Sequence, residues 1–381
     1  MKKLLRQSNF RKALARPLFA ARYLKGKLKA GLSYRFGNGY SLPPGRVFFA
    51  LTGRCNLNCR MCPQKNHPSF RDDMVKQGEA GKDDLLKAVD DIASFRPLVF
   101  VSGGELFLHP AWFDFLSHIK KRRLFCSIGT NGTMLERHAS DLVNIGIDEI
   151  SVSLDGPEPV HDAIRGVPGS YARAVRGMMR IVEEKDRLGV QGPVLNILFT
   201  ITAQNYERLP EMVEIGESVG IDVLRVGHLN FLSPEDFARQ TGISSNLFSI
   251  DHDTSWEGYV TNAHGIDPHR LNIVLDRLKG SAGPVKVVFF PDFTGEEVIR
   301  YYSQGPFRSS SFRNACLVPW DVAVVGPSGE VILCPNYIVG NLRERRFGEI
   351  WNNGRARLFR KAIFRMKQMP VCSRGCCFFY T

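Results

Sequence analysis

The chain has 381 residues, of which 44% are hydrophobic, and a formal net charge of +13. Its length allows one large α/β unit with a smaller unit beside it. No run of about 18 apolar residues is present, so we expect no transmembrane helix, and the basic beginning lacks the apolar stretch that a signal peptide needs. Nine cysteines without a secretion signal favour free or metal-bound thiols in a reducing cytoplasm.

The positive charge is concentrated in the first part of the chain. Residues 1–71 contain sixteen Lys or Arg and no Asp or Glu, whereas the remainder is close to neutral. Because no basic patch interleaved with aromatic residues recurs later, we expect no nucleic-acid partner.

Residues 1–31 mix these charges with apolar side chains. Phe10, Leu14 and Leu18 are four residues apart and would share one side of a helix, although Pro17 disfavours one unbroken helix. Such a basic amphipathic segment predicts contact with an anionic membrane, as a peripheral protein at its inner face. The alternatives are a solvated arm and a helix packed on the outside of the folded body.

Short β-rich runs then alternate with helical stretches up to residue 228. The predicted strands are 47–52, 98–102, 124–129, 148–154, 194–201 and 221–227, and the predicted helices are 83–94, 111–121, 134–144, 170–187 and 205–219. This alternation predicts an α/β fold with parallel strands and right-handed crossovers. In such folds the functional residues gather at the carboxyl ends of the strands.

The alternation stops after His228. Helical signals near 234–240 and 267–279 remain, and the pattern changes again at Cys316, where a cysteine-bearing tail begins. We therefore predict four parts, which are a basic amphipathic segment (1–45), a barrel (46–228), a connecting region that covers the barrel mouth and the substrate (229–315), and a small α+β tail (316–381).

Cys55, Cys59 and Cys62 follow the first predicted strand with the spacing C-x₃-C-x₂-C. Three thiolates leave one iron of a four-iron cluster without a protein ligand, whereas closed iron–sulfur and zinc sites usually take four. The open position suits a small molecule as the fourth ligand. A disulfide loop is disfavoured by the odd spacing, and a zinc site would need a further ligand such as His67.

This cysteine run, with the run VSGGE 41 residues after it, resembles the radical S-adenosylmethionine (SAM) superfamily. The resemblance implies a partial (β/α)₆ TIM-like barrel and a 4Fe–4S cluster on Cys55, Cys59 and Cys62 that chelates SAM. One electron from the reduced cluster then cleaves SAM to methionine and a 5′-deoxyadenosyl radical, which takes a hydrogen atom from the substrate.

The same resemblance implies further contacts to SAM. These are Gly103, Gly104, Glu105, Ser153, Arg165 and Val226. The Gly-Gly-Glu run would hold the amino group, Ser153 and Arg165 the carboxylate, and Val226 the adenine; a guanidinium suits a carboxylate because it offers two planar donors. An ordinary strand-end turn and a surface charge are the alternatives. We interpret the run TNGT (130–133) as a helix cap and Cys126 as a buried apolar residue.

The tail resembles the auxiliary-cluster domains called SPASM in the long form and twitch in the short form. It contains the cysteines Cys316, Cys334, Cys372, Cys376 and Cys377. Five cysteines imply one closed 4Fe–4S cluster, held by the first three and one of the adjacent pair. We favour Cys376 over Cys377, and a tetrahedral zinc site is the alternative. Gly329 precedes Cys334 by five residues, which favours a tight hairpin.

These features predict a radical SAM oxidoreductase or modifying enzyme in which the auxiliary cluster assists electron transfer. The expected partners are SAM, a reductant such as flavodoxin or ferredoxin, and an unidentified substrate. The basic N-terminal segment favours a lipid-linked or cell-envelope substrate. A peptide- or protein-modifying maturase is the first alternative. A non-catalytic iron–sulfur electron-transfer protein is the second, although it would have no use for the SAM-binding residues.

Overall fold

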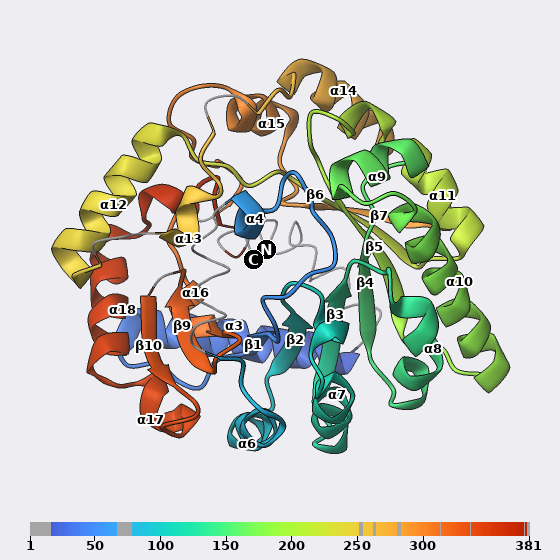
Figure 1. Cartoon of the computed structure of the whole chain (residues 1–381). Helices are drawn as coiled ribbons and strands as arrows, with labels where there is room; N and C mark the ends of the chain where they lie inside the picture. Colours follow the sequence, from blue (N-terminus) through green and yellow to red (C-terminus); the bar gives the residue numbers. More distant parts are fainter. Residues whose placement is uncertain are drawn as a thin grey trace.

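The computed structural model describes residues 17–66, 78–250, 254–261, 264–279, 283–312, 314–335, 337–376 and 378. Within these residues one ten-stranded sheet curves into an open barrel, in the order β10-β9-β8-β1-β2-β3-β4-β5-β6-β7 (Figure 1). The strands are β1 (Arg46–Ala50), β2 (Leu98–Ser102), β3 (Phe125–Thr130), β4 (Glu149–Ser153), β5 (Val194–Thr200), β6 (Val223–Gly227), β7 (Lys286–Phe290), β8 (Val322–Val325), β9 (Glu330–Cys334) and β10 (Tyr337–Asn341). The predicted partial TIM-like barrel is confirmed.

The helices lie around the outside of this sheet and across its two ends (Figure 1). They are α3 (Pro17–Phe36), α4 (Pro63–Asn66), α6 (Lys82–Ala93), α7 (Trp112–Lys121), α8 (Leu135–Asn144), α9 (Glu158–Arg165), α10 (Ser170–Leu188), α11 (Glu211–Val219), α12 (Pro234–Phe248), α13 (Thr254–Glu257), α14 (Pro268–Lys279), α15 (Gly295–Tyr302), α16 (Val318–Asp321), α17 (Phe347–Trp351) and α18 (Gly354–Met366), with short 3₁₀ turns η1 (Leu106–Leu108), η2 (Tyr206–Arg208) and η3 (Pro370–Cys372). No helix in these ranges is long and apolar enough to cross a membrane.

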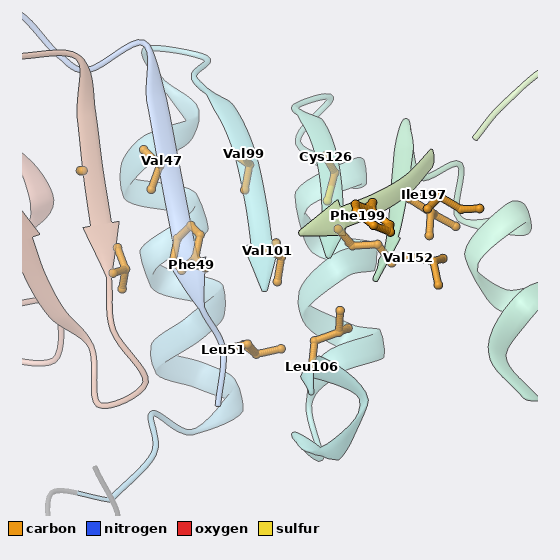
Figure 2. Close-up of a cluster of buried hydrophobic side chains, with 14 of the residues drawn as sticks. Val47, Phe49, Leu51, Val99, Val101, Leu106, Cys126, Val152, Ile197 and Phe199 are labelled. Carbon is orange, nitrogen blue, oxygen red and sulfur yellow. The ribbon is translucent and has the colours of Figure 1, made fainter. Parts of the chain in front are cut away.

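Each barrel strand places alternate side chains on opposite faces of the sheet. The apolar face packs against the helices and is fully buried; Figure 2 shows Val47, Phe49, Val99, Val101, Cys126, Val152, Ile197 and Phe199 in this layer. Cys126 therefore behaves as a buried apolar residue, as predicted. The other face lines the lumen and carries polar side chains such as Ser151 and Arg225. This division leaves the lumen free for polar ligands.

The structure adds a parallel strand after β6 that the sequence pattern did not reveal. β7 pairs with β6 in parallel, with Val223 opposite Lys286. The prediction missed it because the chain between β6 and β7 is much longer than one crossover helix, so the regular spacing of the earlier units is lost. The six predicted strands and five predicted helices are present, with bounds that differ by a few residues.

The tail extends the barrel sheet directly. β8 pairs in parallel with β1, and β9 and β10 continue the sheet as an antiparallel hairpin. Gly329 has a φ of +90° in the turn between β8 and β9, as the predicted hairpin requires. Asp321, which precedes β8, accepts a hydrogen bond from Arg46 at 2.7 Å and is 3.0 Å from Lys27. Burial alone would raise the pKa of Asp321, but these two cations lower it to about 2.

The N-terminal helix α3 closes the bottom of the lumen. The ring of Phe19 lies 5.0 Å from that of Phe125, which starts β3, and Tyr23 is buried in the same apolar cluster with Leu98. The predicted alternative of a packed helix is therefore correct for one face of α3. Phe10 and Leu14 lie outside the described residues.

A buried carboxylate joins α15 to the segment that leads into the tail. Glu297 accepts hydrogen bonds from the Ser309 hydroxyl at 2.6 Å and from the Ser311 hydroxyl and backbone N–H at 2.7 and 2.8 Å. It also completes a capping box with Thr294 at the start of α15. Burial alone would raise the pKa of Glu297, but these donors lower it to about 2.

We expect Glu297→Gln to lower the free energy of unfolding by about 3 kcal/mol, because it removes the charge that several buried donors face. The carboxylate has a lower pKa in the folded than in the unfolded chain. Its stabilisation is therefore complete above pH 4.5 and is lost as the pH falls towards about 2. Urea unfolding across this range measures both effects. The exposed neighbour Glu296→Gln is the matched control, and equal stability of the two variants would contradict the expectation.

Candidate active site

The first cysteine loop (residues 51–62) begins where β1 ends, at the carboxyl edge of the barrel. Cys55, Cys59 and Cys62 are half-buried on it, as free thiols. Burial raises the pKa of Cys55 and Cys59, and the charge of the nearby Cys62 also raises the pKa of both thiols. The three predicted ligands are therefore neighbours on one short loop.

Two glycines let the end of β2 approach this loop closely. A Cβ on Gly103 would lie 2.5 Å from the Thr52 carbonyl oxygen, and one on Gly104 would lie 2.1 Å from that of Arg54. Gly103 also has a φ of +137°, which other residues rarely adopt. Backbone hydrogen bonds from Gly104 to Thr52 and from Glu105 to Arg54, both 2.7 Å, hold the two segments together. The glycine run thus supports the cysteine loop, and its predicted contact with SAM stays a prediction.

The Glu105 carboxylate points into the protein and contacts the run TNGT. It accepts hydrogen bonds from the Thr130 hydroxyl and the Asn131 backbone N–H, both at 2.8 Å. Its side chain is fully buried, and burial raises its pKa to about 7. The carboxylate oxygens are therefore occupied by protein donors, so any contact of Glu105 with the SAM amino group would have to come through its backbone.

Asn131 belongs to the run TNGT, for which the sequence favours helix capping over a place in the pocket; the N-cap of α8 is instead Met134, without a side-chain cap hydrogen bond. Its side-chain amide donates to Asn56 Oδ1 at 2.8 Å and lies 3.9 Å from the Cys55 sulfur. Its Oδ1 accepts from the backbone N–H and hydroxyl of Thr133, so it also shapes the turn before α8. One side chain thus links the end of β3 to the first cysteine loop.

Arg165, at the end of α9, reaches the cysteine loop from the opposite side. One guanidinium nitrogen lies 2.5 Å from Asp155 Oδ2, and the other lies 3.6 Å from the Cys59 sulfur. Burial alone would lower the pKa of Arg165, but the Asp155 carboxylate and the Cys59 thiol raise it. A fixed positive charge therefore lies beside a predicted iron ligand, where it would stabilise a thiolate and attract a carboxylate.

Asp155 is held in place for this role. It accepts from the Thr200 backbone N–H at 3.0 Å, and its own backbone N–H donates to His161 Nδ1 at 3.1 Å. His161 is fully buried, and burial lowers its pKa to about 4, so the ring is neutral. Asp155 and His161 thus have structural roles in holding Arg165 in place.

The end of α9 is joined to the cysteine loop by its backbone as well. The N–H groups of Asn58 and Arg60 donate to the carbonyls of Arg165 and Ile164 at 3.0 and 2.9 Å. A Cβ on Gly166 would lie 2.6 Å from the Asn58 carbonyl oxygen. Two flanks of the barrel mouth therefore clamp the loop that carries the cysteines.

These features fit a 4Fe–4S cluster better than a single metal ion. Within the described ranges no three Cys, His, Asp or Glu side chains are close enough to hold one ion. A cluster does not need this, because each thiolate binds a different iron. Arg165 and the Asn131 amide provide the positive charge and the donor that thiolate sulfurs require.

The remaining two predicted SAM contacts differ in position. Ser153 ends β4 on the lumen face, half-buried, and in the described part of the chain its hydroxyl makes no hydrogen bond. It is therefore free to receive a ligand. Val226 is fully buried on the opposite face of β6, paired with Phe199 in the helix-facing layer. Val226 therefore does not face the lumen. Its neighbours Arg225 and Gly227 lie on the lumen face instead.

A cavity of 360 Å³ adjoins the first cysteine loop. It is lined by Arg60, Met61, Ile164, Thr202, Ala203, Gln204, Leu229, Asn230, Phe231, Gly258, Tyr259, Val260, Thr261 and His264. Arg60 and Met61 lie between the second and third cysteines, Ile164 lies on α9, and the other residues follow β5, β6 and α13. The cavity thus lies at the carboxyl ends of strands, where barrels bind their ligands.

A cluster of aromatic side chains supports one wall of this cavity. The rings of Phe231 and His264 are 4.8 Å apart. His264 Nε2 lies 2.8 Å from the Tyr302 carbonyl oxygen, and its Nδ1 accepts from the Ile266 N–H at 3.1 Å. His264 lines the cavity with both ring nitrogens engaged in hydrogen bonds. Trp256 is buried and His269 lies at the exposed start of α14.

The second cysteine loop (residues 372–376) lies behind this wall. The backbone N–H of Phe231 donates to the Arg374 carbonyl at 3.2 Å. The Arg374 guanidinium donates to the carbonyls of Tyr301 and Gly305 at 2.7 Å and so caps the end of α15. One cavity residue is thus bonded to the loop between Cys372 and Cys376.

The predicted auxiliary ligands are partly brought together. The Cys316 thiol contacts that of Cys372, and this hydrogen bond together with burial raises the pKa of Cys372. Cys334 ends β9, and Cys376 is half-buried against the same core. Cys377 lies outside the described residues, so the choice of Cys376 stays a prediction.

Two family models match the chain, the radical SAM superfamily over residues 49–215 and the SPASM iron–sulfur cluster-binding domain over residues 316–377. Fe-coproporphyrin III synthase of Methanosarcina barkeri is 27% identical and aligns with 81% of this chain and 73% of its own length. The AdoMet-dependent heme synthase of the same organism is 27% identical over 84% of each chain. The solved structure of Streptococcus suis SuiB bound to its precursor peptide SuiA has a TM-score of 0.60 at 14% identity, covering 91% of this chain and 74% of that one; a likeness at this identity concerns the fold alone.

Proposed function

Because the chain belongs to the radical SAM superfamily and ends in a SPASM domain, we propose that it oxidises a substrate held in the cavity between its two cysteine loops. One observation carries this proposal. Arg60 and Met61 of the first cysteine loop form one side of the cavity, and Phe231 on the other side is hydrogen-bonded to Arg374 of the second. A molecule in the cavity would therefore lie between the two iron–sulfur sites.

The proposed reaction balances as a two-electron oxidation. SAM and its cluster, when bound, would supply the chemistry that takes a hydrogen atom from a substrate carbon and releases 5′-deoxyadenosine. The auxiliary site would accept the second electron, and one proton would pass to solvent. The protein contributes binding, orientation and exclusion of water, while the cofactors supply the radical and redox chemistry. Flavodoxin or ferredoxin stays our prediction for the reductant, as do the cytoplasmic location and the division of the chain at residues 45, 228 and 315.

The substrate class has three candidates. A tetrapyrrole is suggested by the names of the two relatives that align with more than four fifths of this chain. His264 would not serve as an axial iron ligand there without losing at least one of its two hydrogen bonds. A peptide is suggested by the complex of SuiB with SuiA. The lipid-linked or cell-envelope substrate, and contact of residues 1–31 with a membrane, stay predictions.

A panel assay tests the proposal. The anaerobically reconstituted enzyme is given SAM and dithionite, and 5′-deoxyadenosine is measured with Fe-coproporphyrin III, with peptides and with isoprenoid-linked sugars. A true substrate should increase the yield above the level found with SAM alone. If none of the three classes increases the yield of 5′-deoxyadenosine, all three candidate substrate classes are excluded.

We expect Ala203→Phe to weaken that stimulation by about tenfold, because the ring would fill the cavity from its exposed rim. SAM cleavage without substrate should be unchanged, since Ala203 is not among the residues predicted to hold the cluster or SAM. Ala238→Phe, on the exposed side of α12, is the matched control. If Ala203→Phe leaves the substrate concentration for half-stimulation unchanged, the substrate binds elsewhere.

A further inference from the structure

The helix α3 has a second apolar face that no described residue covers. Leu24, Leu28 and Leu32 repeat every four residues, with 41%, 65% and 46% of their surface exposed. The opposite face of the helix is the one that packs on the bottom of the lumen, through Phe19 and Tyr23. The leucines therefore point away from the barrel mouth. A row of leucines in this position does not contribute to the core of the protein.

A helix from the other end of the chain lies beside α3 (Figure 1). The ring of Tyr34, on α3, is 5.0 Å from that of Phe364, on α18, and Arg360 donates to the Gly39 carbonyl just after α3 at 3.3 Å. Phe364 and Leu358 of α18 are themselves 39% and 54% exposed. The leucine row of α3 and these two side chains make up what we call the α3–α18 face.

Both helices of this face lie in acid-free sequence. Residues 1–71 hold sixteen basic residues and no acid, and residues 350–381 hold seven basic residues and no acid. Lys25 on α3 and Arg355 and Arg365 on α18 are exposed. The sequence separates these two stretches by about 280 residues, and the fold brings α18 against the C-terminal end of α3, where Phe364 contacts Tyr34.

We propose that the α3–α18 face docks the protein on an anionic lipid bilayer. Exposed apolar side chains flanked by lysines and arginines suit the boundary between headgroups and acyl chains. Each basic residue gains attraction from the negative surface. A second copy of this chain is a poorer occupant, because two such faces would bring like charges together. The proposal goes beyond the contact predicted for residues 1–31, since it requires the C-terminal helix.

Docking in this way fixes the orientation of the active site. The cysteine loops and the cavity lie at the carboxyl ends of the strands, whereas α3 crosses their amino ends. The cavity would thus open away from the bilayer, towards the aqueous side. A lipid-linked substrate would need its reactive carbon on a headgroup long enough to reach past the barrel.

Vesicle co-sedimentation of the full-length protein tests the proposal. The vesicles are phosphatidylcholine alone or mixed with phosphatidylglycerol, at low and at high salt. We expect binding to the anionic vesicles that weakens as salt rises. The pair Leu24→Ser with Leu28→Ser should weaken it at least about tenfold. The pair Arg355→Gln with Arg365→Gln should weaken it roughly fivefold for each charge removed.

Matched controls lie on α14, where Ile273→Ser and Arg277→Gln change exposed residues of the same kinds. These should bind as the unchanged protein does, and all variants should retain SAM cleavage. The proposal is overturned if the protein ignores anionic vesicles, or if the α18 pair binds normally. It is also overturned if the protein forms a dimer that the leucine substitutions dissociate, since that would make the face a protein interface.

Discussion

Single replacement of Cys55, Cys59 or Cys62 by Ala is expected to abolish SAM cleavage while iron at the C-terminal site is retained. Each thiolate holds one iron of a cluster that has no spare protein ligand. The second cysteine loop is fastened separately, through Arg374 and α15. Iron and sulfide analysis after anaerobic reconstitution, together with 5′-deoxyadenosine formation, measures both expectations.

Cys126→Ala is the matched control for these three variants. Its thiol is fully buried in the apolar layer on the helix side of the sheet, with no role in the site (Figure 2). We expect it to cost about 1 kcal/mol of stability through lost packing and to leave SAM cleavage intact. If any of the three loop variants still forms 5′-deoxyadenosine, the assignment of the catalytic cluster is wrong.

The residues at the centre of the site were the easiest to predict from the sequence. The spacing of the cysteines can be read from the sequence alone. Three cysteines at this spacing have few roles other than binding an iron–sulfur cluster. The glycine run was also found, but for an incomplete reason. Its backbone approaches Thr52 and Arg54 of the protein itself, which a sequence cannot distinguish from approach to a ligand.

Residues that act through contacts between distant segments were harder to predict. Asn131 fits a helix cap, and only the pairing of β3 with its neighbours shows that it also reaches Cys55 and Asn56. Val226 was assigned to the site from its position along β6, but a shift of one residue on a strand turns a side chain to the opposite face. β7 was also missed, because a long insertion separates it in the sequence from its partner strand β6.

For the N-terminal helix, amino-acid composition alone did not decide between two arrangements. Basic and apolar residues predicted either a membrane-facing or a packed segment. The structure packs one face of α3 against the bottom of the lumen and leaves an apolar row exposed on the opposite side. Contact of that exposed row with a membrane stays a prediction. Deleting residues 1–31 would therefore remove packing from the bottom of the lumen, so surface substitutions test membrane contact more cleanly than truncation.

Arg165→Ala is expected to weaken SAM binding by roughly ten- to a hundredfold with little change in cluster content. Losing a charge-assisted hydrogen bond costs about 1.5–3 kcal/mol. Arg165 is nine-tenths buried and directed at Cys59, so its guanidinium is already in place before SAM binds. Arg165→Lys should recover part of the affinity, because the charge returns without the planar pair of donors.

Asp155→Asn should act in the same direction through Arg165. Asparagine keeps the Oδ1 acceptor for the Thr200 N–H but removes the charge that faces the guanidinium at 2.5 Å. If Asp155 serves only to position Arg165, adding Asp155→Asn to Arg165→Ala should cost little further SAM affinity, whereas independent contacts would add. Titration of SAM against the cluster signal measures all of these variants, with Arg176→Ala on the exposed side of α10 as the control. Unchanged SAM affinity in Arg165→Ala would remove the carboxylate role predicted for this residue. Fully additive losses in the double variant would show that Asp155 acts independently of Arg165.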